Sequence, residues 1–166
     1  MLVALADTHG TTGPRLTAQL AETVDCAELV VQAGDLTTPA VLDRLESRCE
    51  LRAVHGNSDS TAVTSRLPET RTVEWADHRF VLAHGHRREW TGLSLLARQE
   101  RADVVVVGHT HELWVGARGG VGAVNPGSHA DPRGGVASYV VFERTEGGVV
   151  GRGRTVNGRS LGAVEL

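Results

Sequence analysis

The segment from Val104 to His111 reads VVVVGHTH. Four consecutive β-branched residues are typical of a buried strand, and Gly108 ends the run. His109 and His111 follow it, and residues two apart in an extended chain point to the same side. Two imidazoles directed at one point suit a metal ion better than they suit each other. The alternative is a solvated loop with two unrelated histidines. The rest of the chain decides between these two interpretations.

Strands and helices alternate upstream of this segment. The apolar patterns predict strands over residues 2–6, 28–34 and 51–54, and helices over residues 14–24, 38–48 and 91–102. Strand-helix-strand succession favours a parallel sheet. Hairpins are predicted to turn near Asp77, at Gly119-Gly120 and at Gly147-Gly148. We therefore expect an α/β fold with two mixed sheets flanked by helices, parallel βα units first and antiparallel hairpins at the C-terminal end.

Polar side chains follow each predicted strand of the first part of the chain. In open α/β sheets, ligands bind outside the carboxyl ends of the strands. Capping or turn formation explains only the aspartates and the asparagine in this pattern. The sequence therefore predicts one metal centre, with these seven ligands: Asp7, His9, Asp35, Asn57, His84, His109 and His111.

The mixture of ligand types narrows the choice of metal. There is no thiolate, which excludes a cysteine-rich structural zinc site, and the set is not all oxygen, which disfavours calcium or magnesium alone. Carboxylate, carboxamide and imidazole together suit manganese first, with iron, cobalt, nickel and zinc as alternatives. Seven groups exceed the need of one ion, so we expect two divalent ions sharing a carboxylate, about 3.5–4 Å apart.

Composition sets the general class of the protein. The chain has 166 residues, 40% of them hydrophobic and 22% charged, with a net charge of -3. This predicts a single domain over residues 1–166 without the basic footprint of tight nucleic-acid binding. The N-terminal MLVALAD resembles neither a signal peptide nor a membrane span. Together with Cys26 and Cys49, expected to be reduced, it favours a cytoplasmic protein with no membrane partner, compatible with a homodimer.

The motifs ADTHG, AGDL, HGNSD, AHGH, GHTH and NPGS occur in this order along the chain. In order and spacing the sequence resembles the calcineurin-like metallophosphoesterases. It looks closest to their small single-domain branch of bacterial and archaeal phosphodiesterases, which also includes a scaffold, the phosphoesterase-like subunit of retromer. The resemblance implies a four-layer α/β/β/α sandwich. It further implies that Asp35 bridges two ions, one held with Asp7, His9 and His111, the other with Asn57, His84 and His109.

The implied activity is hydrolysis of a small phosphodiester by a hydroxide that bridges the two ions, with no nucleophilic side chain. Many members of the family carry histidine where this chain has Ser58, which leaves the general acid unassigned. His86 is the nearest candidate for that role, and a solvated loop histidine is the alternative. Asp59 is expected to support Asn57 or an imidazole N–H.

The segment NPGS supplies two further candidates, Gly127 and Ser128, which with Asn57 would contact the substrate phosphate. Ordinary turn formation also explains this segment. Two other functions stay open at this stage. One is a protein-interaction scaffold on the same fold with vestigial metal binding, and the other is a metal-dependent nuclease. The low aromatic content of 4% disfavours a stacking platform for single strands.

Overall fold

The first of two sheets is built around the N-terminal strand. In the computed structural model, which describes residues 1–166, β1 (Leu2–Leu5) pairs in parallel with β2 (Leu29–Ala33), which pairs in parallel with β3 (Leu51–Val54). On its other side β1 pairs antiparallel with β9 (Ser138–Thr145), followed outward by β10 (Gly148–Thr155) and β11 (Ser160–Glu165). The strand order is β11-β10-β9-β1-β2-β3.

The second sheet is built around the valine run. β6 (Val104–Val106) lies between β5 (His78–Ala83) and β8 (Val121–Pro126) and runs parallel to both. The hairpin partners β4 (Thr70–Trp75) and β7 (Leu113–Arg118) form the two edges, in the order β4-β5-β6-β8-β7. Both sheets are therefore mixed, as the sequence predicted.

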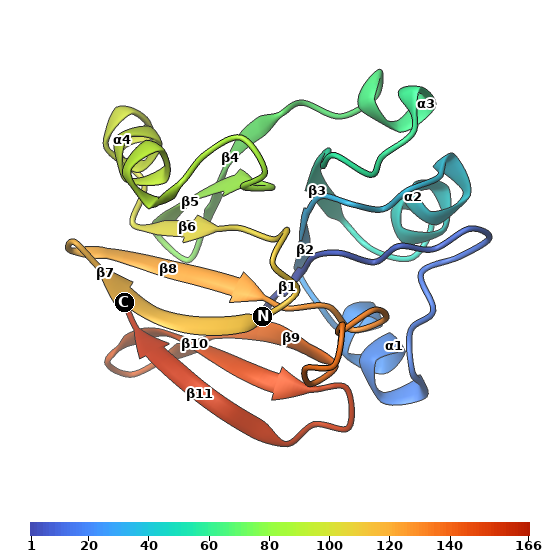
Figure 1. Cartoon of the computed structure of the whole chain (residues 1–166). Helices are drawn as coiled ribbons and strands as arrows, with labels where there is room; N and C mark the ends of the chain where they lie inside the picture. The colour runs from blue at the N-terminus through green and yellow to red at the C-terminus, as the bar shows by residue number, and fades with distance from the viewer.

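The sheets pack face to face with helices outside them, which gives the α/β/β/α layers (Figure 1). A core of 18 buried residues from both sheets fills the space between them. Helices α1 (Ala18–Asp25), α2 (Pro39–Glu46) and α3 (Thr61–Thr64) lie on the first-sheet side. Helix α4 (Trp90–Glu100) covers β5 and β6 of the second sheet.

One local prediction differs from the structure, and two elements were not predicted. The helix expected from Pro14 begins at Ala18, where the Thr17 hydroxyl accepts a hydrogen bond from the Leu20 amide at 3.3 Å. Arg15 adopts a φ of 50°, which no right-handed helix accommodates. Helix α3 and strand β11 were not expected, because neither has a strong apolar period.

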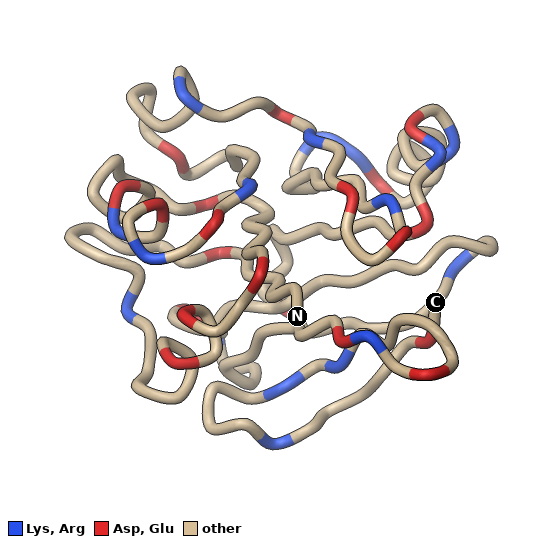
Figure 2. The backbone as a smooth tube through the Cα atoms, turned by 180° about the vertical axis from the view of Figure 1, so that it is seen from behind, with Lys and Arg blue, Asp and Glu red and all other residues tan.

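The surface carries both signs of charge. Figure 2 shows basic and acidic residues interspersed along the backbone, in keeping with the small net charge of -3. None of the helices is both long and apolar enough to cross a membrane.

Candidate metal centre

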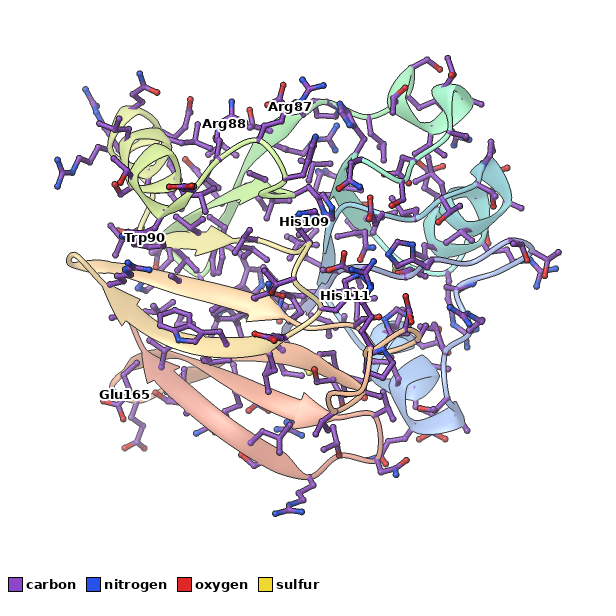
Figure 3. The ribbon with its side chains drawn as sticks, viewed as in Figure 1. Arg87, Arg88, Trp90, His109, His111 and Glu165 are labelled. Carbon is purple, nitrogen blue, oxygen red and sulfur yellow. The ribbon has the colours of Figure 1, made fainter.

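The predicted ligands meet at the seam between the two sheets. Asp7, Asp35 and Asn57 follow β1, β2 and β3 of the first sheet, whereas His84 follows β5 of the second. His109 and His111 lie on the loop that leaves β6, as Figure 3 shows. The carboxyl ends of strands from both sheets thus bring their polar side chains into one region.

Three of the seven residues form one ligand group. One side-chain atom from each of Asp7, His9 and His111 lies within 4.8 Å of the others. Nε2 of His111 is 3.4 Å from Oδ1 of Asp7 and 3.1 Å from Nε2 of His9. Asp7 and His111 are buried, and His9 is half-buried, so the group opens to solvent on the side of His9.

A second group lies next to the first. Asp7, Asp35 and His84 bring one ligand atom each within 4.8 Å of the others, and all three are buried. Oδ2 of Asp35 is 3.4 Å from Nε2 of His84 and 3.4 Å from Nε2 of His9. Asp7 is common to both groups, and one oxygen of Asp35 faces an imidazole of each, the position that a shared ligand would need.

The backbone fixes the orientation of two of these imidazoles. Nδ1 of His84 lies 2.7 Å from the carbonyl oxygen of Ala33, and Nδ1 of His111 faces that of Asp131. A carbonyl only accepts hydrogen bonds, so each Nδ1 carries the proton and each Nε2 is an acceptor when the ring is neutral. Both Nε2 atoms then point into the site, as metal-ligating histidines do.

The donor set fits a cation. Nε2 of His84 faces Oδ2 of Asp35 at 3.4 Å and Oδ1 of Asn57 at 3.1 Å, so three acceptor atoms converge. Such a cluster is unfavourable unless a positive charge lies within it. Burial disfavours a charged His84 ring, yet hydrogen bonding to Asp35 and its negative charge outweigh this and raise the pKa of His84. A metal ion would take the place of that proton.

The two carboxylates differ in their surroundings. Burial raises the pKa of Asp7 to about 6, although His84 and His111 act in the opposite direction. Burial also opposes ionisation of Asp35, but His84 and two hydrogen bonds from Ser58 prevail and hold the pKa of Asp35 below its usual value. The Ser58 amide and hydroxyl each donate to this carboxylate at 2.8 Å. The sequence analysis missed this role of Ser58.

Close backbone packing accompanies the ligands. A Cβ at Gly56 would lie 2.2 Å from Oδ1 of Asp35, and one at Gly108 would lie 2.9 Å from Oδ2 of Asp7. A set of five predicted ligands also adopts positive φ, between 41° and 73°: Asp7, His9, Asp35, His109 and His111. Non-glycine residues seldom adopt this conformation, and it concentrates at functional sites.

Asp59 supports the site through the backbone. Its carboxylate accepts hydrogen bonds from the amides of Gly56, Asp35 and Thr37, at 2.7, 3.1 and 2.5 Å. It forms no hydrogen bond with Asn57 or with an imidazole, the partners that the sequence suggested. The carboxylate therefore ties the loop after β3 to the loop after β2 and so positions Asp35.

His109 and His86 lie at the open side of the site. The His109 ring centroid is 5.3 Å from that of His84, and its backbone amide donates to the Asp7 carboxylate at 2.9 Å. His109 belongs to neither three-residue group. The His86 ring lies 5.3 Å from His84, and its Nδ1 is buried without a partner. Burial first, and then the nearby His84 and Arg87, lower the pKa of His86.

The loop that contains Gly127 and Ser128 packs behind the ligands. Ser128 is fully buried, and its hydroxyl donates to the Asp7 carbonyl at 2.6 Å. The Gly127 amide donates to the Asn125 side chain at 2.9 Å. These contacts favour a supporting role for the loop over the predicted contact with a substrate phosphate.

Comparison with known proteins places these features in a family. The family model for the calcineurin-like phosphoesterase superfamily domain matches residues 1–147. A probable metallophosphoesterase of Methanothermobacter thermautotrophicus is 32% identical over 140 residues, which cover 80% of this chain and 79% of that protein. Phosphodiesterase YfcE of Escherichia coli K12 is 38% identical over 97 residues, 55% of this chain and 51% of that protein.

Solved structures agree with the fold. The structure of YfcE, described as a phosphoesterase, superposes with a TM-score of 0.73 at 25% identity, over 98% of this chain and 97% of that chain. Vacuolar Protein Sorting 29 from Cryptosporidium parvum superposes with a TM-score of 0.81 at 20% identity, over 99% and 96% of the two chains. The second similarity shows the fold alone.

Proposed function

The chain belongs to the calcineurin-like phosphoesterase superfamily, and on that basis we propose that it hydrolyses phosphodiester bonds with two bound divalent metal ions. The supporting observation is the convergence of carboxylate, amide and imidazole atoms from both sheets, with Oδ2 of Asp35 3.4 Å from an imidazole nitrogen on either side. Five of the seven predicted ligands form two adjoining groups, and the seven together are more than one ion requires.

The proposed ligand sets share Asp35. Together with Asp35, one ion would be held by Asp7, His9 and His111. The other ion would be held by Asp35 with Asn57, His84 and His109. Manganese is our first choice of metal, with iron, cobalt, nickel and zinc as alternatives, because these ions accept mixed oxygen and nitrogen ligands. When bound, the ions would supply an activated water and neutralise charge on the phosphoryl oxygens.

The reaction adds one water to the diester and gives a monoester and an alcohol. Ser58 would keep Asp35 ionised through its two hydrogen bonds at 2.8 Å. Asp59 would hold the loops in place, and the carbonyls of Ala33 and Asp131 would hold their imidazoles with Nε2 inward. His86, whose ring centroid lies 5.3 Å from that of His84, would protonate the departing oxygen.

The test is removal and replacement of metal. After chelation we expect no hydrolysis of an activated aryl phosphodiester, and recovery when manganese is added, with two equivalents bound by elemental analysis. Iron, cobalt, nickel and zinc would be compared under the same conditions, and the matching phosphomonoester would report on diester preference. Undiminished hydrolysis by metal-free protein would refute the proposal. Tight binding of two ions without hydrolysis of any ester would indicate a scaffold instead.

A further inference from the structure

A pocket of about 300 Å³ opens directly beside the candidate metal centre. Gly108 and His109 line it on the side of the centre, and Trp90 and Trp114 also line it. Figure 3 shows Trp90 between α4 and β8 in that view, with His109 on the loop beyond the end of β6. The pocket and the candidate centre thus share a residue, and a molecule held in one would reach the other.

The pocket exists because α4 covers only part of the second sheet. The helix packs on β5 and β6, whereas the outer face of β7 lies beyond it. Alternate residues of β7 share that outer face, and these are Trp114, Gly116 and Arg118. A Cβ at Gly116 would lie 3.1 Å from the Trp114 indole, so the ring lies across the glycine. The floor includes the small residue Ala123 of β8.

The aromatic side chains and one arginine give the pocket its chemistry. The chain has three tryptophans, and two of them line this pocket. The Trp114 side chain is 45% exposed, unusual for so large an apolar group. The Arg118 guanidinium lies 4.9 Å from the Trp90 ring centroid, and no carboxylate lies within 4.0 Å of it. The other lining arginine, Arg88, is already paired with Glu69.

We propose that this pocket binds the base of a nucleoside esterified to the phosphate held at the metal centre. The inference rests on the proposed function and specifies its substrate as a small nucleoside phosphodiester. A volume of about 300 Å³ is at the lower end of the range for small-molecule sites and suits one base. Indole rings stack on any base, and the free Arg118 donors match its ring nitrogens and carbonyls.

The decisive experiment compares two diesters that differ only in the base, adenosine 5′-(methyl phosphate) and ribose 5-(methyl phosphate). Both break the same bond, so the ratio of their kcat/KM values isolates the pocket. We expect a ratio between about 5 and 100 in favour of the nucleoside, the range that stacking of one base gives. Trp114→Ala should bring the ratio close to 1, mainly through a lower kcat/KM for the nucleoside diester. Trp114→Phe should retain most of the preference.

A matched control and a blocking variant accompany this comparison. Leu161→Ala removes another exposed apolar side chain, 39% exposed on β11 of the other sheet, and should leave the ratio unchanged. Gly116→Val removes neither tryptophan from the sequence, but its side chain would displace the Trp114 indole from above residue 116. It should also abolish the preference. If thermal melting shows that Trp114→Ala is unfolded, Gly116→Val provides the test instead.

Binding of adenosine to metal-free protein gives a readout independent of hydrolysis. Saturable quenching of tryptophan fluorescence is expected in the unmodified protein and in Leu161→Ala, but not in Trp114→Ala or Gly116→Val. Failure to hydrolyse any diester with any metal would end the proposed function, and with it the substrate assignment. Hydrolysis of both diesters at equal rates, without saturable adenosine binding, would overturn the pocket assignment and leave the proposed function intact.

Discussion

Asp35 faces an imidazole of each ligand group. Its Oδ2 is 3.4 Å from Nε2 of His9 in one group and from Nε2 of His84 in the other. We expect Asp35→Ala to lower kcat/KM by more than about 100-fold, at least as much as Asp7→Ala, because even supporting residues of metal sites cost 10–100-fold. Elemental analysis should find fewer than two ions. Asp43→Ala, an exposed carboxylate on α2, is the control, and two tightly bound ions in Asp35→Ala would contradict the shared ligand.

His86 lies beside His84, and its buried Nδ1 has no hydrogen-bond partner. If it protonates the leaving oxygen, His86→Ala should slow a diester with a poor alkyl leaving group by about 10²–10⁴-fold. An activated aryl diester, which departs without a proton, should react almost normally, and metal content should not change. Equal slowing of both substrates would assign His86 to the phosphate or the ions, and no slowing would make it an ordinary loop residue.

Residue types and their positions after strands were enough to propose the seven ligands from the sequence. The groups that orient them were not predictable in the same way. The carbonyls of Ala33 and Asp131 belong to residues of no special chemistry, and their role depends on where the backbone runs. Ser58 was noticed only as a departure from the family pattern, although it donates twice to Asp35.

At the scale of the element, apolar runs predicted most strands well, because burial on both faces requires continuous β-branched sequence. Helix beginnings were less certain, since Pro14 is typical of a helix start but Thr17 caps the helix in the structure. The aromatic pocket depends on how far α4 extends across its sheet. No local pattern records that distance, so the two tryptophans were not connected by the sequence analysis.

The loop after β3 provides a test of close packing at a strand end. A Cβ at Gly56 would lie 2.2 Å from Asp35 Oδ1 and 2.7 Å from the His84 ring. We therefore expect Gly56→Ala to displace both ligands and to reduce metal content and hydrolysis by about 10-fold or more. Gly162→Ala on β11 is the matched control, because a Cβ there meets nothing within 4 Å. Full metal content in folded Gly56→Ala protein would contradict this prediction. It would show that the loop shifts to accommodate the added Cβ without displacing the ligands.

At the scale of the whole molecule, a layered α/β fold with two mixed sheets was predictable, because strand-helix alternation gives way to hairpins along the chain. The assignment of each strand to one of the two sheets was not predictable. Strands β5 and β6 continue the βα alternation in sequence, yet they leave the sheet of β1 to β3 and build the other one. Long-range pairing decides this, and the pairs are too far apart in the sequence to show as a local pattern.

Acid should destabilise the molecule through His129, which is buried with Nε2 donating to the Pro14 carbonyl at 2.8 Å. Burial lowers its pKa to about 4, from 6.5 for an exposed histidine. Between these values the unfolded chain binds a proton that the folded chain does not. The free energy of unfolding should therefore fall as the pH drops from about 6.5 to 4, by about 1.4 kcal/mol per pH unit from this group.

Urea unfolding of metal-free protein at pH 7, 6 and 5 would measure this effect. His129→Gln retains a donor for Pro14 but cannot titrate, so its stability should depend less steeply on pH. His55→Gln, at a half-buried histidine, is the control for loss of any imidazole. Equal slopes for the unmodified protein and His129→Gln would show that other groups govern acid unfolding.

The pairing of β1 with β9 has a consequence for the order of folding during synthesis. Leu2 lies opposite Phe142 in the sheet, so β1 leaves the ribosome long before β9, the strand that covers its second edge. Until then that edge is open to other chains, and such edges promote aggregation. The nascent chain should therefore depend on protection by chaperones until β9 has emerged, however stable the finished protein is.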